Sequence, residues 1–374
     1  MQRSKRFLLI TLLILWGVAS LALAWPTAAQ GQNGVHAIPI SLLAFNVALS
    51  PDAKTLAAAA DHNMYADPDP APILPRTIYL IDLANGKETA VLGSQTDFTD
   101  ALAFSPDGTR LVSFYGNGQL NVWDVSNKTI LKSYHLPGLG FATFQFFPDG
   151  KRVAVLAQLR PTWILVVDIE TGAITATYGP PVSTRASAVN AEVPLMGDLS
   201  YSTFALAPDG RQFATVTLND EIDLWDTASG GMSVLFQPTQ KTMHLDISPI
   251  QFSPDGKSLV YYHHTDDRLH VWDLGTQKER AIKVTGGDHL AFNAKGDQIA
   301  WIAKQKVYTW DFKAASPTKV AALDPELHVQ PRRTVTCFTP DNAHLIVANL
   351  ASSASSNQEN QIYVIMLPTG AAAS

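Results

Sequence analysis

The sequence predicts an all-β fold, a seven-bladed β-propeller whose blades are four-stranded antiparallel sheets. Three observations support this prediction. A short pattern recurs seven times, its copies lie about 48 residues apart, and each copy contains hydrophobic runs separated by turn residues. Repeats of roughly 40–50 residues that carry four strands each are typical of propeller blades. The clearest copy comprises residues 101–104, 105–108, 110–113 and 120–124.

A Pro-Asp-Gly-like turn follows the first hydrophobic run of each copy. Pro presets the φ angle of its turn position, Asp bonds to nearby backbone, and Gly accepts a positive φ. Such a turn joins two antiparallel strands, here the inner strands a and b. The turns lie at residues 51–53, 106–108, 148–150, 208–210 and 254–256, with altered copies at 294–296 and 340–342.

A Trp-Asp pair ends the third hydrophobic run in four of the copies. A polar turn and a fourth run follow in most copies, so each copy supplies strands a, b, c and d from the inside of the ring outward. The pairs are Trp123-Asp124, Trp225-Asp226, Trp272-Asp273 and Trp310-Asp311, and the corresponding dipeptides elsewhere are Ile81-Asp82, Val167-Asp168 and Ile365-Met366.

Over residues 35–370, these turns and Trp-Asp pairs resemble the WD-repeat β-propeller family. Envelope propellers of the TolB kind have similar Asp-Gly turns and are the nearest alternative. The resemblance implies an Asp-His-Ser/Thr-Trp hydrogen-bond network in each blade, incomplete here because no Gly-His pair is in register. Part of the network is expected from Ser113 with Trp123 and Thr215 with Trp225, and Asp266 lies where the Asp of the b–c turn belongs.

The seventh copy lacks its outer strand. Its a, b and c strands are predicted near residues 334–338, 344–348 and 361–367, and a spare apolar run at 35–40 precedes the first a strand at 45–49. We therefore expect the N-terminal strand to pair with the last c strand. This pairing closes the ring and covers a sheet edge that would otherwise promote association.

Residues 1–29 are predicted to be a signal peptide or an N-terminal membrane anchor. Arg3, Lys5 and Arg6 precede an uncharged apolar run at residues 7–24, and small residues at 22–24 and 27–29 offer cleavage sites. An uncleaved anchor is the alternative, because 18 apolar residues just span a bilayer. Either reading predicts an exported propeller that is periplasmic, extracellular or anchored to the outer side of the cytoplasmic membrane.

The chain is acidic and has one cysteine. Its formal charge is −6, and without Arg3, Lys5 and Arg6 it has 24 basic and 33 acidic residues, a charge of −9. An acidic chain without a basic run argues against a nucleic-acid partner. Cys337 falls in an inner strand and is expected to be a buried, inert thiol.

Four long departures from the repeat are predicted to share one rim of the ring. The a–b and c–d turns of a four-stranded blade lie at one end of the blade, and the b–c turns and d–a crossings lie at the other. Long loops on a rigid scaffold are where recognition usually occurs, although tolerated drift is an equal alternative. The departures are residues 61–76 and 351–360 between strands b and c, and 180–200 and 324–333 between d and a.

A partner-binding surface is predicted on this rim, because Arg and aromatic residues often anchor interfaces. Catalytic motifs, cofactor motifs and metal-ligand spacing are not found, and Asp61, Asp67 and Asp69 match no calcium loop. His263 and His264 are adjacent, so on a strand they point to opposite faces. The chain is expected to be a non-catalytic protein-binding or scaffold module, with a propeller-type enzyme (lactonase or quinone-cofactor dehydrogenase) as the alternative. The predicted rim residues are Tyr65, Arg76, Arg160, Trp163, Arg185, Arg332 and Arg333.

Overall fold

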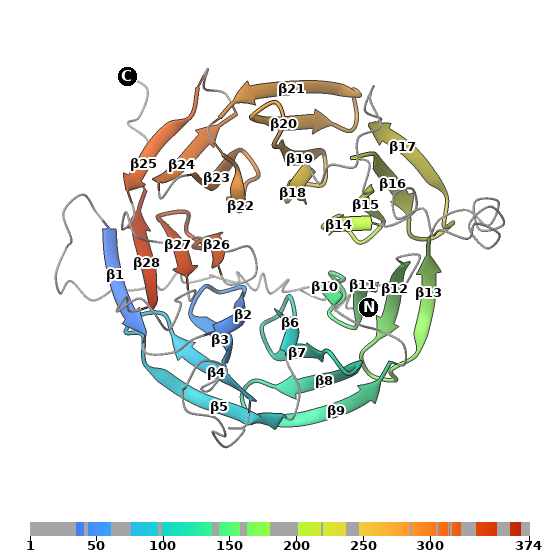
Figure 1. The fold of residues 1–374 in the computed structure, drawn as a ribbon, viewed down its shortest axis with the longest axis vertical. Helices are drawn as coiled ribbons and strands as arrows, with labels where there is room; N and C mark the ends of the chain where they lie inside the picture. Colours follow the sequence, from blue (N-terminus) through green and yellow to red (C-terminus); the bar gives the residue numbers. More distant parts are fainter. Residues whose placement is uncertain are drawn as a thin grey trace, which may run out of the picture.

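A computed structural model confirms the seven-bladed propeller. Seven four-stranded antiparallel sheets stand around a central axis, with inner strands towards the axis and outer strands along the circumference (Figure 1). The structure describes residues 35–40, 44–60, 76–95, 99–136, 142–157, 163–179, 201–217, 220–236, 247–284, 286–303, 306–312, 314, 316–322, 334–349 and 360–367.

The first four blades follow the chain from inside to outside. Blade 1 consists of β2 (Ala44–Leu49), β3 (Thr55–Ala60), β4 (Arg76–Asp82) and β5 (Glu88–Gln95). Blade 2 consists of β6 (Thr99–Phe104), β7 (Arg110–Tyr115), β8 (Gln119–Asp124) and β9 (Thr129–His135). Blade 3 consists of β10 (Ala142–Phe146), β11 (Arg152–Ala157), β12 (Trp163–Asp168) and β13 (Ile174–Tyr178). Blade 4 consists of β14 (Tyr201–Leu206), β15 (Gln212–Thr217), β16 (Ile222–Asp226) and β17 (Met232–Phe236).

The last three blades complete the ring. Blade 5 consists of β18 (Ile247–Phe252), β19 (Ser258–His263), β20 (Arg268–Asp273) and β21 (Lys278–Lys283). Blade 6 consists of β22 (Asp288–Phe292), β23 (Gln298–Ala303), β24 (Lys306–Asp311) and β25 (Thr318–Ala322). Blade 7 consists of β26 (Thr334–Phe338), β27 (His344–Asn349), β28 (Asn360–Met366) and the N-terminal strand β1 (Val35–Ile40).

Strand β1 closes the ring, as the sequence predicts. It pairs antiparallel with β28, with Val35 opposite Ile365 and Ile38 opposite Ile362. Ile38 is buried in a cluster that also contains Ile81 of blade 1. The N-terminal strand is therefore both the outer strand of blade 7 and part of its contact with blade 1.

The hydrophobic core lies between the blades. The buried residues form seven clusters, and each cluster joins two neighbouring blades. Between blades 3 and 4, Phe213 and Trp225 stack with ring centroids 5.7 Å apart, and Tyr178 meets Phe213 edge-on at 4.9 Å. Because both faces of a blade are covered in this way, strands b such as β7 and β11 are almost continuously buried, whereas outer strands such as β9 and β21 are polar and largely exposed.

Each residue of a Trp-Asp pair has its own structural role. Trp123 Nε1 donates to Ser113 Oγ at 2.8 Å, and Trp225 Nε1 donates to Thr215 Oγ1 at 3.0 Å, so these two predicted bonds are confirmed. The Asp residue that follows the Trp caps the c–d turn. Asp124 Oδ1 accepts from the Asn127 backbone N–H at 2.7 Å, and this bond helps to lower the pKa of Asp124.

The network is incomplete in blades 5 and 6, also as predicted. Tyr261 and Trp301 occupy the strand-b positions at which blades 2 and 4 have a hydroxyl residue. Within the described part of the chain, Trp272 Nε1 consequently has no hydrogen-bond partner. Trp310 Nε1 donates instead to the Ala314 carbonyl at 3.1 Å. Replacing a small hydroxyl residue by an aromatic one thus removes the bond within the blade.

Outer strands also bond to the next blade. Tyr134 at the end of β9 donates its hydroxyl to the Glu170 carbonyl of blade 3 at 2.5 Å. Tyr178 at the end of β13 donates to the Thr227 carbonyl of blade 4 at 2.7 Å. Gly172 has a φ of 73° and lies against the Tyr134 ring, which leaves no room for a side chain there. These tyrosines connect successive blades at the c–d turns.

Candidate functional site

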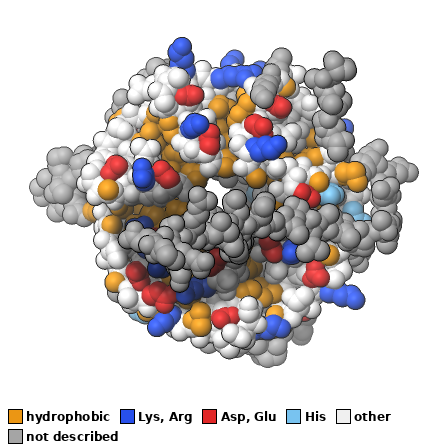
Figure 2. Space-filling view, turned by 180° about the vertical axis from the view of Figure 1, so that it is seen from behind, with side chains coloured by type: hydrophobic (Ala, Val, Ile, Leu, Met, Phe, Trp, Pro, Cys, Tyr) orange, Lys and Arg blue, Asp and Glu red, His pale blue; other side chains and the backbone are white. Residues whose placement is uncertain are grey.

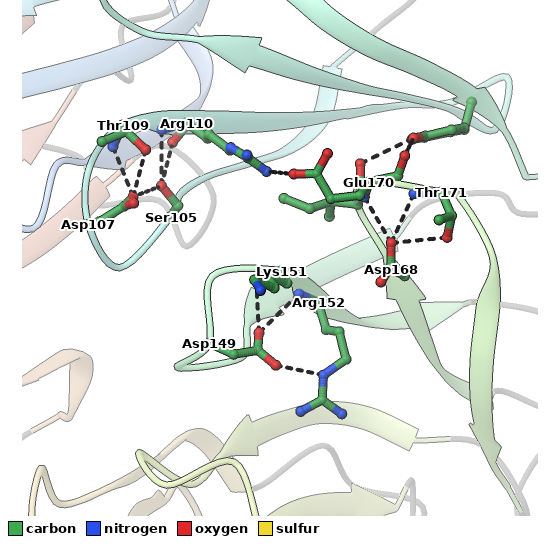
Figure 3. A network of polar contacts seen from close by, with 12 residues as sticks. Ser105, Asp107, Thr109, Arg110, Asp149, Lys151, Arg152, Asp168, Glu170 and Thr171 are labelled. Atoms are coloured by element: carbon green, nitrogen blue, oxygen red, sulfur yellow. Dashed lines mark hydrogen bonds and ion pairs between the residues drawn. The ribbon is translucent and has the colours of Figure 1, made fainter.

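The rim formed by the a–b and c–d turns is short and internally bonded. In blade 2, Ser105 Oγ donates to Asp107 Oδ1 at 2.5 Å, and the Arg110 backbone N–H donates to Ser105 Oγ at 3.0 Å (Figure 3). The bond from Ser105 is the main cause of the lowered pKa of Asp107. The same hydroxyl-to-Asp bond recurs at Ser50, Ser253 and Thr339.

Charged side chains of this rim also form ion pairs with one another. The Arg110 guanidinium of blade 2 pairs with Glu170 of blade 3, and Arg152 Nε lies 2.7 Å from Asp149 Oδ2 (Figure 3). Both pairs are partly exposed, so each contributes little to stability. Their importance here is that the polar groups of this rim bond to one another.

The opposite rim carries the long connections. The strand order of each blade places residues 61–75 and 350–359 between strands b and c, and residues 180–200 and 323–333 between d and a. Since strands in a blade are antiparallel, these four connections leave the blades at the same end. We call this end the b–c rim. The predicted placement of the four insertions is therefore confirmed by the strand topology.

Of the seven predicted rim residues, only Trp163 has a described side chain. It is the first residue of β12, is half-buried, and its ring lies over Gly179, where a side chain would clash. Arg76 begins β4 at the same rim. The remaining predicted residues lie outside the described residues, so the proposed gathering of these side chains stays a prediction. They are Tyr65, Arg160, Arg185, Arg332 and Arg333, together with the calcium alternatives Asp61, Asp67 and Asp69.

A group of carboxylates lies at the b–c rim of blade 4, at residues that sequence reasoning missed. Asp220 and Glu221 form the turn before β16, and Asp223 is the second residue of that strand. The turn is fixed by the Glu221 backbone N–H, which donates to Thr217 Oγ1 at 3.1 Å. Asp223 lies opposite Thr215 and on the same side of the strand as Trp225, which faces blade 3.

Asp223 is buried and has a raised pKa. Asp223 is only 3% exposed, and its Oδ1 atom has no hydrogen-bond partner among the described residues. Burial, and next the negative charge of Glu221, raise the pKa of Asp223 from 3.8 to about 7. A signal in the sequence was available: Asp223 stands two residues before Trp225, a position that shares the strand face of the Trp and points into a blade junction.

A second polar group lies on blade 5, on the face towards blade 4. His270 bonds through Nδ1 to Glu279 Oε1 at 2.8 Å and through Nε2 to Asp266 Oδ2 at 3.1 Å. The Tyr261 ring stacks on His270 at 4.8 Å, and its hydroxyl donates to Glu279 at 2.7 Å. Burial lowers the pKa of His270, but Glu279 and Asp266 together raise it above the ordinary value.

The adjacent histidines of blade 5 point to opposite faces, as predicted. His263 Nδ1 lies 3.3 Å from Asp266 Oδ1, whereas the His264 ring meets Tyr262 edge-on at 4.7 Å. Among the side chains that the structure describes, no three His, Cys, Asp or Glu residues are placed to hold a metal ion. Cys337 in β26 is half-buried rather than fully buried, and it packs against the junction of blades 7 and 1, where burial raises the pKa of its thiol to about 12.

The surface around the central opening is mixed in charge. On the face shown in Figure 2, Lys and Arg side chains alternate with Asp and Glu around the ring. No helix within the described ranges, which start at residue 35, is long and apolar enough to cross a membrane.

One family of known proteins matches the chain. The model of the WD domain, G-beta repeat, matches residues 86–124, which run from the c–d turn of blade 1 to the end of β8 in blade 2. No curated protein matches the chain. The matched stretch contains the Ser105–Asp107 turn and the Trp123–Ser113 bond described above.

Proposed function

We propose that this WD-repeat-like β-propeller is an exported, non-catalytic binding module that holds a protein partner on its b–c rim. WD-repeat propellers commonly act as scaffolds for other proteins. The observation that carries the proposal is the difference between the rims. All four predicted insertions, and also the ten-residue connection 237–246 between β17 and β18, leave the blades at the b–c rim, whereas the opposite rim consists of short turns whose polar groups bond to one another.

The scaffold beneath the b–c rim is suited to binding. Interblade clusters and tyrosine bonds fix the blades relative to one another, so residues at their ends are held in place. A rigid support reduces the entropy lost when a partner binds. Trp163 is half-buried at this rim and offers an aromatic anchor of the kind that is frequent at interface centres.

The apolar run at residues 7–24 supports the proposed export. Protein recovered from the envelope or medium of the native host is expected to begin after Ala24 or Ala29, or to retain the run as an anchor. Intact-mass analysis distinguishes these forms. A cytoplasmic protein that keeps its N-terminus would contradict export.

Site-specific crosslinking tests the binding surface. A benzoylphenylalanine residue at position 163 on the b–c rim is expected to capture a specific protein from envelope extract, and the same residue at position 151 on the opposite rim is not. Replacing residues 180–200 by a short Gly-Ser segment should leave the circular dichroism spectrum unchanged and abolish the crosslink. A crosslink at position 151 that survives this replacement would show that the other rim binds the partner.

A further inference from the structure

We propose that the charge of His270 controls how firmly the b–c turn of blade 5, residues 264–267, is held. The imidazolium connects Asp266 of this turn to Glu279 of β21, and loss of the ring proton loosens the turn at the b–c rim. The inference goes beyond the proposed function, because it concerns the shape of this rim without a partner. It depends on how the ring is bonded, on the backbone of the turn, and on the groups around the ring.

The first argument is that both ring nitrogens of His270 face carboxylates. Nδ1 lies 2.8 Å from Glu279 Oε1, and Nε2 lies 3.1 Å from Asp266 Oδ2. A neutral imidazole has one N–H, whereas the imidazolium donates from both nitrogens. Only the charged ring can therefore donate to the two carboxylates at the same time.

The bond to Glu279 is the one that a neutral ring keeps. It is the shorter of the two, and Glu279 Oε1 is also fixed by the Tyr261 hydroxyl, which donates to it at 2.7 Å. The Tyr261 ring stacks on His270 with centroids 4.8 Å apart, so the imidazole itself stays in place. The lone pair of Nε2 then faces Asp266 Oδ2 and repels it. His263 Nδ1 is 3.3 Å from the other oxygen of Asp266, longer than an ordinary hydrogen bond, and holds the turn less firmly.

The backbone of the turn also favours loosening. Asp267 has a φ of 55°, a left-handed conformation that costs energy in a residue with a side chain. Blade 2 has Gly118, with a φ of 86°, at the equivalent position before strand c. In both blades the carbonyl of this residue accepts from the residue after strand d, Val284 in blade 5 and Leu136 in blade 2. The Tyr262 hydroxyl donates to Asp267 Oδ1 at 3.1 Å, and this bond is independent of the charge of His270. Blade 5 therefore uses side-chain bonds to hold a turn for which blade 2 uses a glycine.

The groups around His270 favour its charged form at neutral pH. Burial opposes a charge on the ring, but Glu279 and Asp266 outweigh burial and raise the pKa of His270 above its ordinary value of 6.5. Blade 4 packs on this face of blade 5 with apolar side chains. Arg268 and Lys283 form an exposed pair on the same strand face, one pair nearer the b–c rim. The titratable and charged groups that the structure describes around His270 on this face are thus Tyr261, His263, Asp266, Arg268, Glu279 and Lys283.

Hydrogen exchange, followed by mass spectrometry, measures how firmly the turn is held. The Val284 amide reports on blade 5, because it donates to the Asp267 carbonyl at 2.8 Å. The Leu136 amide is the internal control, since it makes the equivalent bond in blade 2, where Asn121 replaces His270. After correction for the intrinsic exchange rate, the protection of Val284 should fall at least fivefold between pH 6 and pH 8.5. The protection of Leu136 should change less than twofold.

Three variants separate the bridge from other effects of pH. His270→Gln cannot carry the charge, so Val284 should be weakly protected at both pH values. Asp266→Asn offers an N–H to the neutral ring and a carbonyl oxygen to the charged ring, so Val284 should be well protected at both. His263→Gln is the matched control and should keep the wild-type pH dependence. In the wild type, ¹⁵N NMR should show both ring nitrogens of His270 protonated at pH 6 and only Nδ1 protonated at pH 8.5.

Several results would overturn the inference. Equal protection of Val284 in the wild type at pH 6 and pH 8.5, a pH dependence that persists in His270→Gln, or its loss in His263→Gln would each do so. A His270 ring that is already neutral at pH 6 would have the same consequence. None of these measurements involves a partner, so failure of the proposed function, which the crosslink at position 163 tests, is recognised separately.

Discussion

Asp223→Asn should make the protein more stable at neutral and alkaline pH. The Asp223 and Glu221 side chains share a hydrogen bond, which also raises the pKa of Asp223. Asn has nearly the shape of Asp, can donate a hydrogen bond to Glu221, and carries no charge. The wild-type carboxyl must ionise in a buried site beside another carboxylate, which raises its pKa from 3.8 to about 7. The folded protein therefore binds a proton that the unfolded chain releases, and the free energy of unfolding falls as the pH rises from about 4 to about 7.

The size of the effect follows from the pKa shift. Each pKa unit corresponds to about 1.4 kcal/mol, so a shift of roughly three units gives at most about 4 kcal/mol at pH 8. Below pH 4 both proteins carry a neutral group at position 223, and their free energies of unfolding should agree within about 1 kcal/mol. The advantage of the variant should grow through the range between these limits.

Urea unfolding at pH 4, 5, 6, 7 and 8, followed by tryptophan fluorescence, measures this dependence. The wild-type free energy of unfolding should decline with pH more steeply than that of the variant, and Asp209→Asn should keep the wild-type slope. Equal slopes for wild type and Asp223→Asn would refute the reasoning. A less stable variant at pH 8 would show that the charged form of Asp223 is satisfied within the folded chain.

Three further predictions concern ring closure, the contact between blades and the polar group of blade 5. Deleting residues 35–40 should lower the melting temperature and promote association, because the edge of β28 and the cluster in which Ile38 is buried become exposed. Calorimetry measures the melting temperature and light scattering measures association. An equally stable monomer would contradict this role of β1. Tyr178→Phe should reduce the free energy of unfolding by about 1 kcal/mol through loss of the bond to the Thr227 carbonyl, and an unchanged urea midpoint would argue against that bond. The stabilisation from charged His270 should be fully present below pH 6.5 and be lost as the pH rises through its raised folded pKa. His270→Gln should remove this part of the pH dependence of the free energy of unfolding between pH 5.5 and 8.5. If the free energy of unfolding of the variant changed with pH as steeply as that of the wild type, His270 would not be its cause.

The sequence predicts the architecture well because the repeat is built from local chemistry. A Ser-Pro-Asp-Gly turn holds its own hydrogen bonds, as Ser105 and Asp107 show, and a Trp-Asp pair fixes both a strand contact and a turn cap. The spare strand at residues 35–40 was also predictable, because an incomplete blade leaves one specific partner for it.

The chemistry at the rim was less predictable. The spacing from Trp225 indicates that Asp223 lies on the strand face that enters a blade junction, but how deeply the carboxyl is buried there depends on how the two blades meet. Asp223 and Glu221 read as ordinary polar residues of a turn until the strand register places Asp223 on the face towards blade 3. The loops that were predicted to bind lie mostly outside the described residues, so their side chains remain predictions.

The blades differ in the polar side chain that they carry at one position of strand c. Two residues before the Trp of strand c, blade 2 has Asn121, blade 4 has Asp223 and blade 5 has His270, and each points towards the preceding blade. Asn121 is completely buried, and among the described residues its Nδ2 atom, like Oδ1 of Asp223, has no hydrogen-bond partner. In blade 5 the side chain at this position is His270, whose ring nitrogens bond to Glu279 and Asp266. The residue at this position therefore changes the charge at each blade junction while the register between strands b and c stays the same, with Asn121 opposite Ser113, Asp223 opposite Thr215 and His270 opposite Tyr261.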